Sequence, residues 1–276
     1  MVRVFSGKDG GLPATDRGLA YGDGLFETIR VNGSSAPLLP RHLDRLARDA
    51  RRLGIDVSRH ELEEIAVSAL TAGADARGES AWVLKLIITR GAGGRGYRPD
   101  PEAAVNVLVL ESAAPPAPPS EGVNADFSRV PLTVNPLLCG IKTLNRLEQV
   151  MAARELKGDL FEVLMSNAAG EIVEGTRTNL FVETDTGWWT PPAHTLAVAG
   201  VMRGHVLACL QQRGEPVFES PLTLSDLMSD TCRGLYLTNS VLGVVSVANL
   251  AGQVLPVSGR LATLCALPSA MDGASS

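Results

Sequence analysis

Lys142 is the residue of this chain whose type and position first suggest chemistry. It lies in the stretch GIKTLNRLEQV, residues 140–150, and is one of only four lysines among 276 residues. The apolar residues that follow it recur at helical spacing: Leu144, Leu147, Val150 and Met151. This spacing predicts an amphipathic helix with Lys142 at or just before its N-terminus, where unpaired backbone N–H groups disfavour a cation. Two interpretations follow: a solvated lysine in a poor position, or an amine whose lowered pKa suits a nucleophile or base.

A nucleophilic lysine suggests pyridoxal phosphate, a cofactor that makes definite demands on a protein. It needs an amine for its aldehyde, a cation and N–H donors for its phosphate, and a group that tunes its pyridine nitrogen. Helix N-termini supply such N–H donors. The turn AGVMRG, residues 199–204, leads into a predicted helix at 202–213, which makes the backbone N–H groups of Val201 and Met202 candidate phosphate donors.

A second glycine-rich stretch, GAGGRG at residues 91–96, matches the dinucleotide-binding pattern GxGxxG but lacks its context. In a dinucleotide site the glycines open a helix, whereas here Pro99 and Pro101 follow at once. The short separation of the flanking predicted strands instead indicates an antiparallel hairpin. Its loop carries side chains that could bind carboxylates: Arg95, Tyr97 and Arg98.

Composition restricts the class of protein. The chain is 45% hydrophobic and 20% charged, with a formal net charge of −5, which argues against a nucleic-acid-binding protein. We expect neither a secretory signal nor a membrane span, because no apolar run approaches ~20 residues. The four cysteines and four histidines are scattered, so we expect free thiols in a reducing cytoplasm and no metal site.

A proline-rich segment divides the chain. The stretch ESAAPPAPPSEG, residues 111–122, favours an extended connector. We predict a small α+β domain at 1–112, a linker at 113–122 and a larger α/β domain at 123–276 that carries Lys142. The alternative is a long surface loop within one domain.

Hydrophobic periodicity predicts the elements of both domains. Helices are expected at 41–53, 60–72, 202–213 and 224–229, and after Lys142. Strands are expected at 25–31, 81–90, 104–112, 161–167, 178–184, 234–240 and 244–250.

Five motifs occur in the order found in the fold-type IV pyridoxal-phosphate enzymes, the class IV aminotransferase family. They are DRGLAYGDGLFETIRV (16–31), RHLDRL (41–46), GIKTLNRLEQV (140–150), SNAAGEIVEGTRTNLF (166–181) and GVMRG (200–204). The chain therefore resembles this family over nearly its whole length. Within the family, KTLNRLEQV and LKLIITRGAGGRGY (84–97) most resemble the aminodeoxychorismate lyases. The resemblance implies the fold of the D-amino-acid aminotransferases and a homodimer.

The resemblance also assigns catalytic roles. Lys142 matches the lysine that binds the cofactor covalently and then acts as base and acid. Glu174 matches the carboxylate that pairs with the pyridine nitrogen. Glu171 is a nearby competitor, and only the spacing to the NLF residues selects Glu174.

Further residues match phosphate and substrate positions of the family. Arg45 of the HxxRL motif matches the phosphate-binding arginine, although the helical pattern alone places it off the apolar stripe, in solvent. Ser240 matches a phosphate-binding hydroxyl, with Thr238 as the alternative. The candidates for the substrate carboxylates are Arg30, Arg95 and Tyr97.

The expected activity is conversion of 4-amino-4-deoxychorismate to p-aminobenzoate and pyruvate, in the folate branch. Glu27 departs from several lyases and also occurs in the aminotransferases, so the alternative is a D- or branched-chain-amino-acid aminotransferase. The approach to GVMRG at 190–200 also departs from the usual family pattern. A catalytically silent cofactor-binding protein is a third possibility, which the presence of Lys142, Glu174 and Arg45 disfavours.

Overall fold

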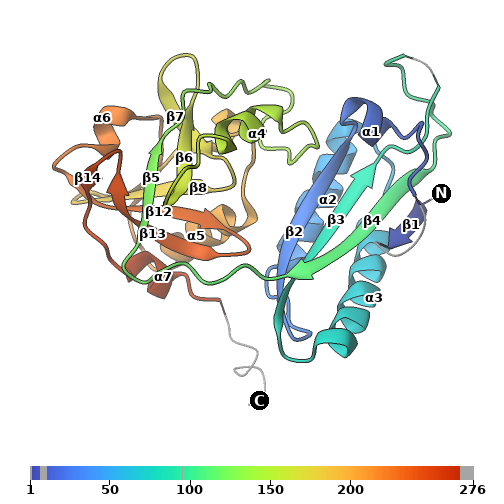
Figure 1. Ribbon diagram of the computed structural model, residues 1–276, viewed down its shortest axis with the longest axis horizontal. Helices are drawn as coiled ribbons and strands as arrows, with labels where there is room; N and C mark the ends of the chain where they lie inside the picture. The colour runs from blue at the N-terminus through green and yellow to red at the C-terminus, as the bar shows by residue number, and fades with distance from the viewer. Residues whose placement is uncertain (1, 7–10, 95, 268–276) are drawn as a thin grey trace. The chain divides into compact units, whose positions relative to one another are not determined.

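The structure is a computed structural model that describes residues 2–6, 11–94 and 96–267. It contains two compact units (Figure 1). Unit 1 comprises the chain up to Pro115 together with the short segment Lys142–Asn145. Unit 2 comprises Pro116–Ile141 and Arg146–Leu267. Each unit is described by itself.

Unit 1 is a four-stranded sheet with two long helices. Its elements are β1 (Val2–Ser6), α1 (Arg17–Tyr21), β2 (Gly24–Asn32), α2 (Leu39–Leu53), α3 (Arg59–Arg77), β3 (Ala81–Thr89) and β4 (Val105–Ala113). The strand order is β1-β4-β3-β2, in which β1 is parallel to β4 and the other pairs are antiparallel. Helices α2 and α3 pack on one face of this sheet (Figure 1).

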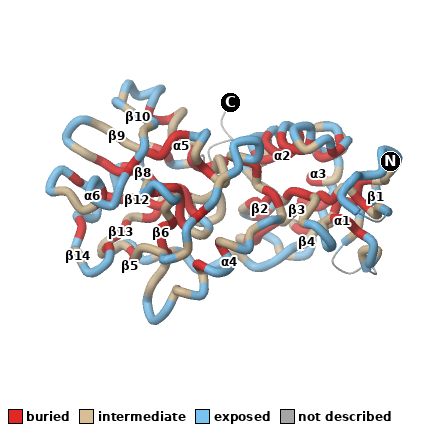
Figure 2. The backbone as a smooth tube through the Cα atoms, turned by 90° about the horizontal axis from the view of Figure 1, so that it is seen from above, coloured by how far each residue is buried: buried red, intermediate tan, exposed pale blue. Residues whose placement is uncertain are grey.

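Alternation along β2 decides which side chains face the helices. Leu25, Glu27 and Ile29 are buried, whereas Phe26 and Thr28 between them are only half-buried. Successive side chains of a strand point to opposite faces, so the half-buried positions lie on the face that α2 and α3 leave open. In Figure 2 the buried positions follow β2, β3 and α2.

Unit 2 is built around a larger mixed sheet. Its elements are β5 (Val123–Phe127), α4 (Leu147–Ala153), β6 (Leu160–Ser166), β7 (Glu171–Gly175), β8 (Asn179–Thr184), β9 (Gly187–Thr190), η1 (Ala193–Thr195), α5 (Val201–Gln212), β10 (Val217–Glu219), β11 (Leu222–Thr223), α6 (Leu224–Leu227), β12 (Cys232–Asn239), β13 (Gly243–Leu250), β14 (Gln253–Val254) and α7 (Arg260–Leu264). The strand order is β10-β9-β8-β12-β13-β5-β6-β7-β11, and β14 pairs with β13. Helix α5 packs on β12.

The architecture expected from the sequence is confirmed: an α+β N-terminal part and a larger part built on a second sheet. Strands β3 and β4 form an antiparallel hairpin, as predicted from the sequence in place of a dinucleotide-binding unit. Within the described ranges no helix is long and apolar enough to cross a bilayer.

Two sequence-based boundaries differ from the structure. Strand β4 continues to Ala113, one residue into the predicted linker, and the units divide between Pro115 and Pro116. Lys142, which the predicted scheme assigns to the larger domain, packs with unit 1. The domain boundaries themselves stay a prediction.

Candidate active site

Lys142 is held in an extended segment that pairs with the edge of β2. The N–H of Phe26 donates to the carbonyl oxygen of Lys142 at 3.1 Å, and the N–H of Leu144 donates to that of Gly24 at 3.0 Å. Between these bonds Thr143 forms an antiparallel bridge with Leu25. The backbone of unit 1 therefore fixes the lysine like an additional short strand.

The helix predicted directly after Lys142 is wrong in position and in its buried face. Helix α4 begins at Leu147, five residues later, and its buried residues are Gln149 and Ala152. Leu147 and Val150 are exposed by 73% and 57%. Pairing of residues 142–144 with β2 holds this segment out of a helix, so the helix starts only afterwards. The helix-dipole argument for Lys142 therefore does not apply.

Two of the four lysines approach one aromatic ring. The ammonium nitrogen of Lys142 lies 4.2 Å from the centroid of the Phe26 ring, and that of Lys85 on β3 lies 5.1 Å from it. The register pairs Lys85 with Thr28, the next residue of β2 on the same face as Phe26. Lys85 lies in the stretch LKLIITRGAGGRGY, but its approach to Phe26 depends on the strand register, which the sequence does not show.

Arg45 is buried, so the solvated position that the helical pattern predicts for it is wrong. Its Nε donates to Oε1 of Glu27 at 2.7 Å, and its Nη2 donates to the other oxygen. Nδ1 of His42 lies 2.6 Å from the same carboxylate. A buried guanidinium is tolerated because this ion pair compensates its charge.

The Glu27 carboxylate stays ionised in this cluster. Burial alone would raise the pKa of Glu27, but the charge of Arg45 and the hydrogen bonds from His42 and Arg45 outweigh it and hold the pKa at about 2. Burial lowers the pKa of His42, which therefore donates to Glu27 as a neutral ring. The Nε2 of His42 is buried without a hydrogen-bond partner in the described structure.

In unit 2, Glu174 lies on β7 and is 3% exposed. Its Oε2 accepts a hydrogen bond from the N–H of Val198 at 3.0 Å. The competitor Glu171 begins β7 and instead accepts from Nδ2 of Asn167 at 2.8 Å, across the β6–β7 hairpin. Burial of the carboxylate and its contact with the approach to α5 favour Glu174 for the pyridine nitrogen.

Helix α5 begins with backbone N–H groups that no side chain caps. Its N-cap is Gly200, which has no side chain that could accept hydrogen bonds from the first turn. Val201 and Met202, the predicted phosphate donors, are the first two residues of the helix and are buried. An uncapped helix N-terminus is suited to an anion, because both its N–H groups and the helix dipole favour negative charge.

The two hydroxyl candidates differ in their surroundings. Thr238 is 2% exposed on β12, and its hydroxyl donates to the carbonyl oxygen of Asn179 at 3.5 Å. Ser240 lies in the turn after β12 and is half-buried. Ser240 is thus the more exposed of the two residues, and its role at the phosphate stays a prediction.

The substrate candidates all belong to unit 1. Arg30 lies half-buried on β2 and donates to the Asn32 side chain at 3.3 Å. Tyr97 is 85% exposed, with its ring centroid 5.5 Å from that of Tyr21. Arg95 lies outside the described residues.

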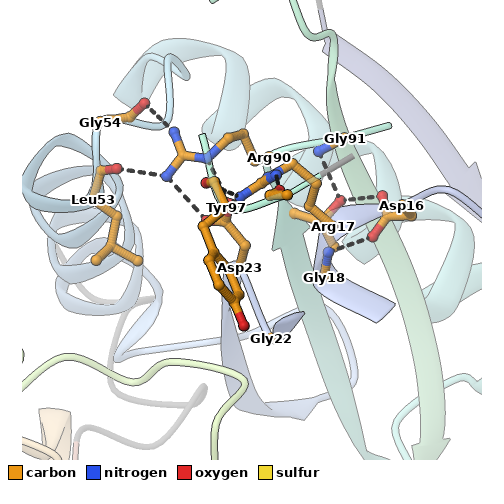
Figure 3. Close-up of polar contacts among 12 residues, drawn as sticks. Asp16, Arg17, Gly18, Gly22, Asp23, Leu53, Gly54, Arg90, Gly91 and Tyr97 are labelled. Atoms are coloured by element: carbon orange, nitrogen blue, oxygen red, sulfur yellow. Dashed lines mark hydrogen bonds and ion pairs between the residues drawn. The ribbon is translucent and has the colours of Figure 1, made fainter. Parts of the chain in front are cut away.

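Two arginines on one aspartate fix the glycine-rich loop (Figure 3). Nε of Arg17 and Nε of Arg90 each donate to Asp23 at 2.8 Å. Arg17 also donates to the carbonyl oxygens of Gly96 and Tyr97 at 3.1 and 2.8 Å. Arg17 and Asp23 lie in the first motif, at 16–31, but the sequence gives no sign of their contacts with this loop.

The chain is similar to known enzymes over most of its length. The profile of the family described as amino-transferase class IV matches residues 24–250. An aminodeoxychorismate lyase of Vibrio harveyi is 33% identical over 243 residues, which cover 87% of each chain. A protein of Methanocaldococcus jannaschii with the provisional name branched-chain-amino-acid aminotransferase is 31% identical over 253 residues, covering 90% of this chain and 85% of that one.

Among solved structures, the 4-amino-4-deoxychorismate lyase of Pseudomonas aeruginosa superposes with a TM-score of 0.86 at 36% identity, covering 93% of each chain. The family match spans well over half of the chain and includes Lys142, Glu174 and the start of α5. The chain therefore belongs to the class IV aminotransferase family, whose members depend on pyridoxal phosphate.

Proposed function

We propose that this chain is a pyridoxal-phosphate-dependent lyase that converts 4-amino-4-deoxychorismate to p-aminobenzoate and pyruvate, a step of folate biosynthesis. The observation that carries the proposal is that a sequence relative and a solved structure, at 33% and 36% identity, are both aminodeoxychorismate lyases. Each match covers at least 87% of this chain.

The chemistry of the residues fits the cofactor. The buried carboxylate of Glu174 is of the chemical type that pairs with a protonated ring nitrogen. The start of α5 offers N–H groups without a side-chain cap to a phosphate. Lys142 supplies a primary amine fixed by backbone pairing with β2. When bound, the cofactor supplies an electron-withdrawing ring that stabilises negative charge at the substrate carbon next to the amine.

Lys142 holds the cofactor and moves the proton. Its amine would hold the cofactor covalently before the substrate binds. The free amine would then act as the base that removes the proton from the amine-bearing carbon of the substrate. The enolpyruvyl group then leaves and the ring becomes aromatic. Protonation of the released enolpyruvate at its methylene carbon gives pyruvate, the second product.

Glu174 and the anion-binding groups orient the reactants. The carboxylate of Glu174 would keep the ring nitrogen of the bound cofactor protonated, so that the ring can accept electrons. The N–H groups of Val201 and Met202 and the hydroxyl of Ser240 would hold the phosphate, together with Arg45, whose guanidinium is also paired with Glu27. The two carboxylates of the substrate are assigned to Arg30, Arg95 and Tyr97.

The second candidate is an aminotransferase acting on D- or branched-chain amino acids. Relatives of that kind at 31% and 28% identity support it. Glu27, which the sequence analysis took as a sign of this activity, lies on the helix-covered face of β2 and binds Arg45. Its structural partner thus accounts for Glu27 under either activity.

The need for an acceptor separates the two activities. The lyase reaction splits one substrate into two products, whereas transamination requires a 2-oxo acid. Purified protein is mixed with 4-amino-4-deoxychorismate and no oxo acid, and both products are followed, with Lys142→Ala in parallel. Turnover that the substitution abolishes supports the lyase. If the protein binds the cofactor but forms no p-aminobenzoate, the lyase activity is refuted. Amino acids with 2-oxoglutarate are then the substrates to test.

We further propose a cytoplasmic homodimer. Unit 2 exposes apolar side chains on α4 and on the turn before Lys142: Leu137, Leu138, Leu147, Val150 and Met151. Five exposed apolar side chains within residues 137–151 are a density typical of protein interfaces. All four cysteines are free, as suits a reducing compartment. Sedimentation of wild type and of Leu147→Glu tests the dimer, which the charge should dissociate.

A further inference from the structure

We propose that Asn179 is a positioning residue that sets the phosphate-binding end of α5 without using the N–H groups that the phosphate needs. The inference rests on the proposed function, because it assumes that the cofactor phosphate binds at this helix start. It concerns a residue to which the sequence analysis assigned no role.

Asn179 binds the segment before α5 with both ends of its amide. Its Nδ2 donates to the carbonyl oxygen of Val198 at 3.0 Å, and its Oδ1 accepts from the N–H of Gly200 at 3.1 Å. The residue is 5% exposed, so water competes little for these bonds. One buried side chain therefore fixes two of the three residues that precede the helix.

Glu174 holds the same segment from a second strand. The N–H of Val198 donates to Oε2 of Glu174, while the carbonyl oxygen of Val198 accepts from Asn179. Strand β8, which begins at Asn179, pairs with β12 with Asn179 opposite Thr238. The proposed partner of the pyridine nitrogen and the proposed phosphate end are thus connected through Val198.

Gly200 is a glycine because of Asn179 rather than because of its backbone angle. Its φ of −63° is accessible to any residue. A Cβ at this position would lie 2.1 Å from Oδ1 of Asn179, far inside contact distance. The close approach of the asparagine to the backbone therefore excludes a side chain here.

The consequence concerns how the helix starts. An ordinary N-cap side chain accepts hydrogen bonds from the first-turn N–H groups and would compete with a ligand for them. Asn179 instead binds the N–H of Gly200, one residue before the helix. It orders the helix start while leaving the N–H groups of Val201 and Met202 uncapped by side chains.

The test compares pyridoxal 5′-phosphate with pyridoxal, which lacks the phosphate, by visible absorption titration of the apoprotein. Asn179→Ala should lower the affinity for pyridoxal 5′-phosphate about tenfold, which corresponds to the loss of roughly one well-placed set of hydrogen bonds. Its affinity for pyridoxal should stay within about twofold, because that ligand depends on the Lys142 amine.

Asn179→Asp separates positioning from mere folding. The carboxylate can still accept from Gly200 but loses the bond to the Val198 carbonyl oxygen. Because it keeps one of the two bonds, and an anion at a helix N-terminus is favourable, the thermal unfolding temperature of the apoprotein should fall no further than in Asn179→Ala. The same charge repels phosphate, so affinity for pyridoxal 5′-phosphate should fall at least as far as in Asn179→Ala. Asn167→Ala is the matched control, since Asn167 also uses both ends of its amide, but within the β6–β7 hairpin. It should leave the ratio of the two affinities unchanged.

Each outcome has a distinct meaning. Wild-type protein that binds neither ligand refutes the proposed function itself. Wild-type binding with an unchanged affinity ratio in both Asn179 variants overturns the positioning role alone. A third outcome also overturns the positioning role: affinity for both ligands falls equally in Asn179→Ala, and affinity and stability are both restored in Asn179→Asp. That result would mean that Asn179 serves folding only.

Discussion

Glu27 of β2 and Arg45 of α2 form a two-point ion pair inside unit 1, with both oxygens of the carboxylate bound by the guanidinium. The pair joins the sheet to the helix that carries the proposed phosphate-binding arginine. Because each partner is buried, removal of one would leave an uncompensated charge. The orientation of Arg45 therefore depends on Glu27, a residue of the neighbouring strand.

The Glu27 pair should make stability depend on acid pH. The pKa of Glu27 is about 2 in the folded protein, against 4.5 as the ordinary value. A lowered folded pKa contributes stability above pH 4.5 that is lost as the pH falls toward 2. Roughly 2 kcal/mol of this contribution should disappear between pH 6 and pH 3. Urea unfolding of wild type and Glu27→Gln at both values measures it.

The variant provides the reference for that measurement. Glu27→Gln should be less stable by about 3 kcal/mol at pH 6, because Arg45 loses its charged partner. The difference between the two proteins should shrink at pH 3. A difference that does not change with pH would mean that Glu27 does not titrate as the ion pair requires.

Sequence patterns found the regular elements and failed where distant segments pair. The stripe of α2 correctly predicted a helix, but it placed Arg45 in solvent because Glu27, 18 residues away, is not part of the helical pattern. Lys142 was assigned to a helix start because its pairing partner, β2, is more than 110 residues earlier. Periodicity reports local geometry, whereas both errors concern contacts between segments.

The roles of the candidate residues came from motifs rather than from periodicity. Glu174 could be distinguished from Glu171 only by spacing, and the structure adds the burial that supports the choice. Asn179 belongs to the same motif, but its function in holding Val198 and Gly200 required coordinates. Short strands such as β10 and β11 went unpredicted, because three and two residues cannot show a period.

Gly24→Ala should displace the segment that carries Lys142. A Cβ at Gly24 would lie 2.2 Å from the carbonyl oxygen of Ile88 and 2.8 Å from Cδ1 of Leu144. The strand backbone cannot yield easily, so Leu144 and its neighbours must move, at a cost of about 1–3 kcal/mol. The visible band of the lysine-bound cofactor should weaken at a fixed cofactor concentration. Gly11→Ala is the control, since nothing lies within 4 Å of its Cβ; equal spectra for the two variants would contradict the prediction.

Glu162→Gln should destabilise unit 2 through the turn between β7 and β8. The buried carboxylate accepts from the N–H and hydroxyl of Thr176 at 3.0 and 2.6 Å and from the hydroxyl of Thr178 at 3.0 Å. The glutamine amide has only one oxygen, and its NH2 group would face the donors that the second carboxylate oxygen now binds. This should lower the free energy of unfolding by roughly 2–3 kcal/mol. Denaturant unfolding measures it, with the exposed Glu121→Gln as reference. A loss no larger than that of the reference would show that the turn does not depend on the charge.

Asp23→Asn should loosen the glycine-rich loop that carries Tyr97. Burial would raise the pKa of Asp23, but hydrogen bonds from Arg90 and Arg17 outweigh it and lower the pKa, so the group is an anion at neutral pH. Arg90 also donates to the carbonyl oxygens of Leu53 and Gly54, which should keep it in place without the charge. Arg17 has its other bonds to the loop itself, so its release frees the loop.

Hydrogen exchange of the Gly93 amide, which donates to the carbonyl oxygen of Thr15 from within this loop, measures the loosening. Exchange should be about tenfold faster for a loss near 1.4 kcal/mol. If Tyr97 contacts the substrate, KM should rise while kcat changes little, because Lys142 and Glu174 are untouched. Asp44→Asn is the matched control, since Asp44 pairs with Arg59 on an exposed surface where ion pairs contribute little. Unchanged exchange in Asp23→Asn would mean that the arginines hold the loop without Asp23. A fall in kcat alone would mean that the loop acts in the chemical step rather than in substrate binding.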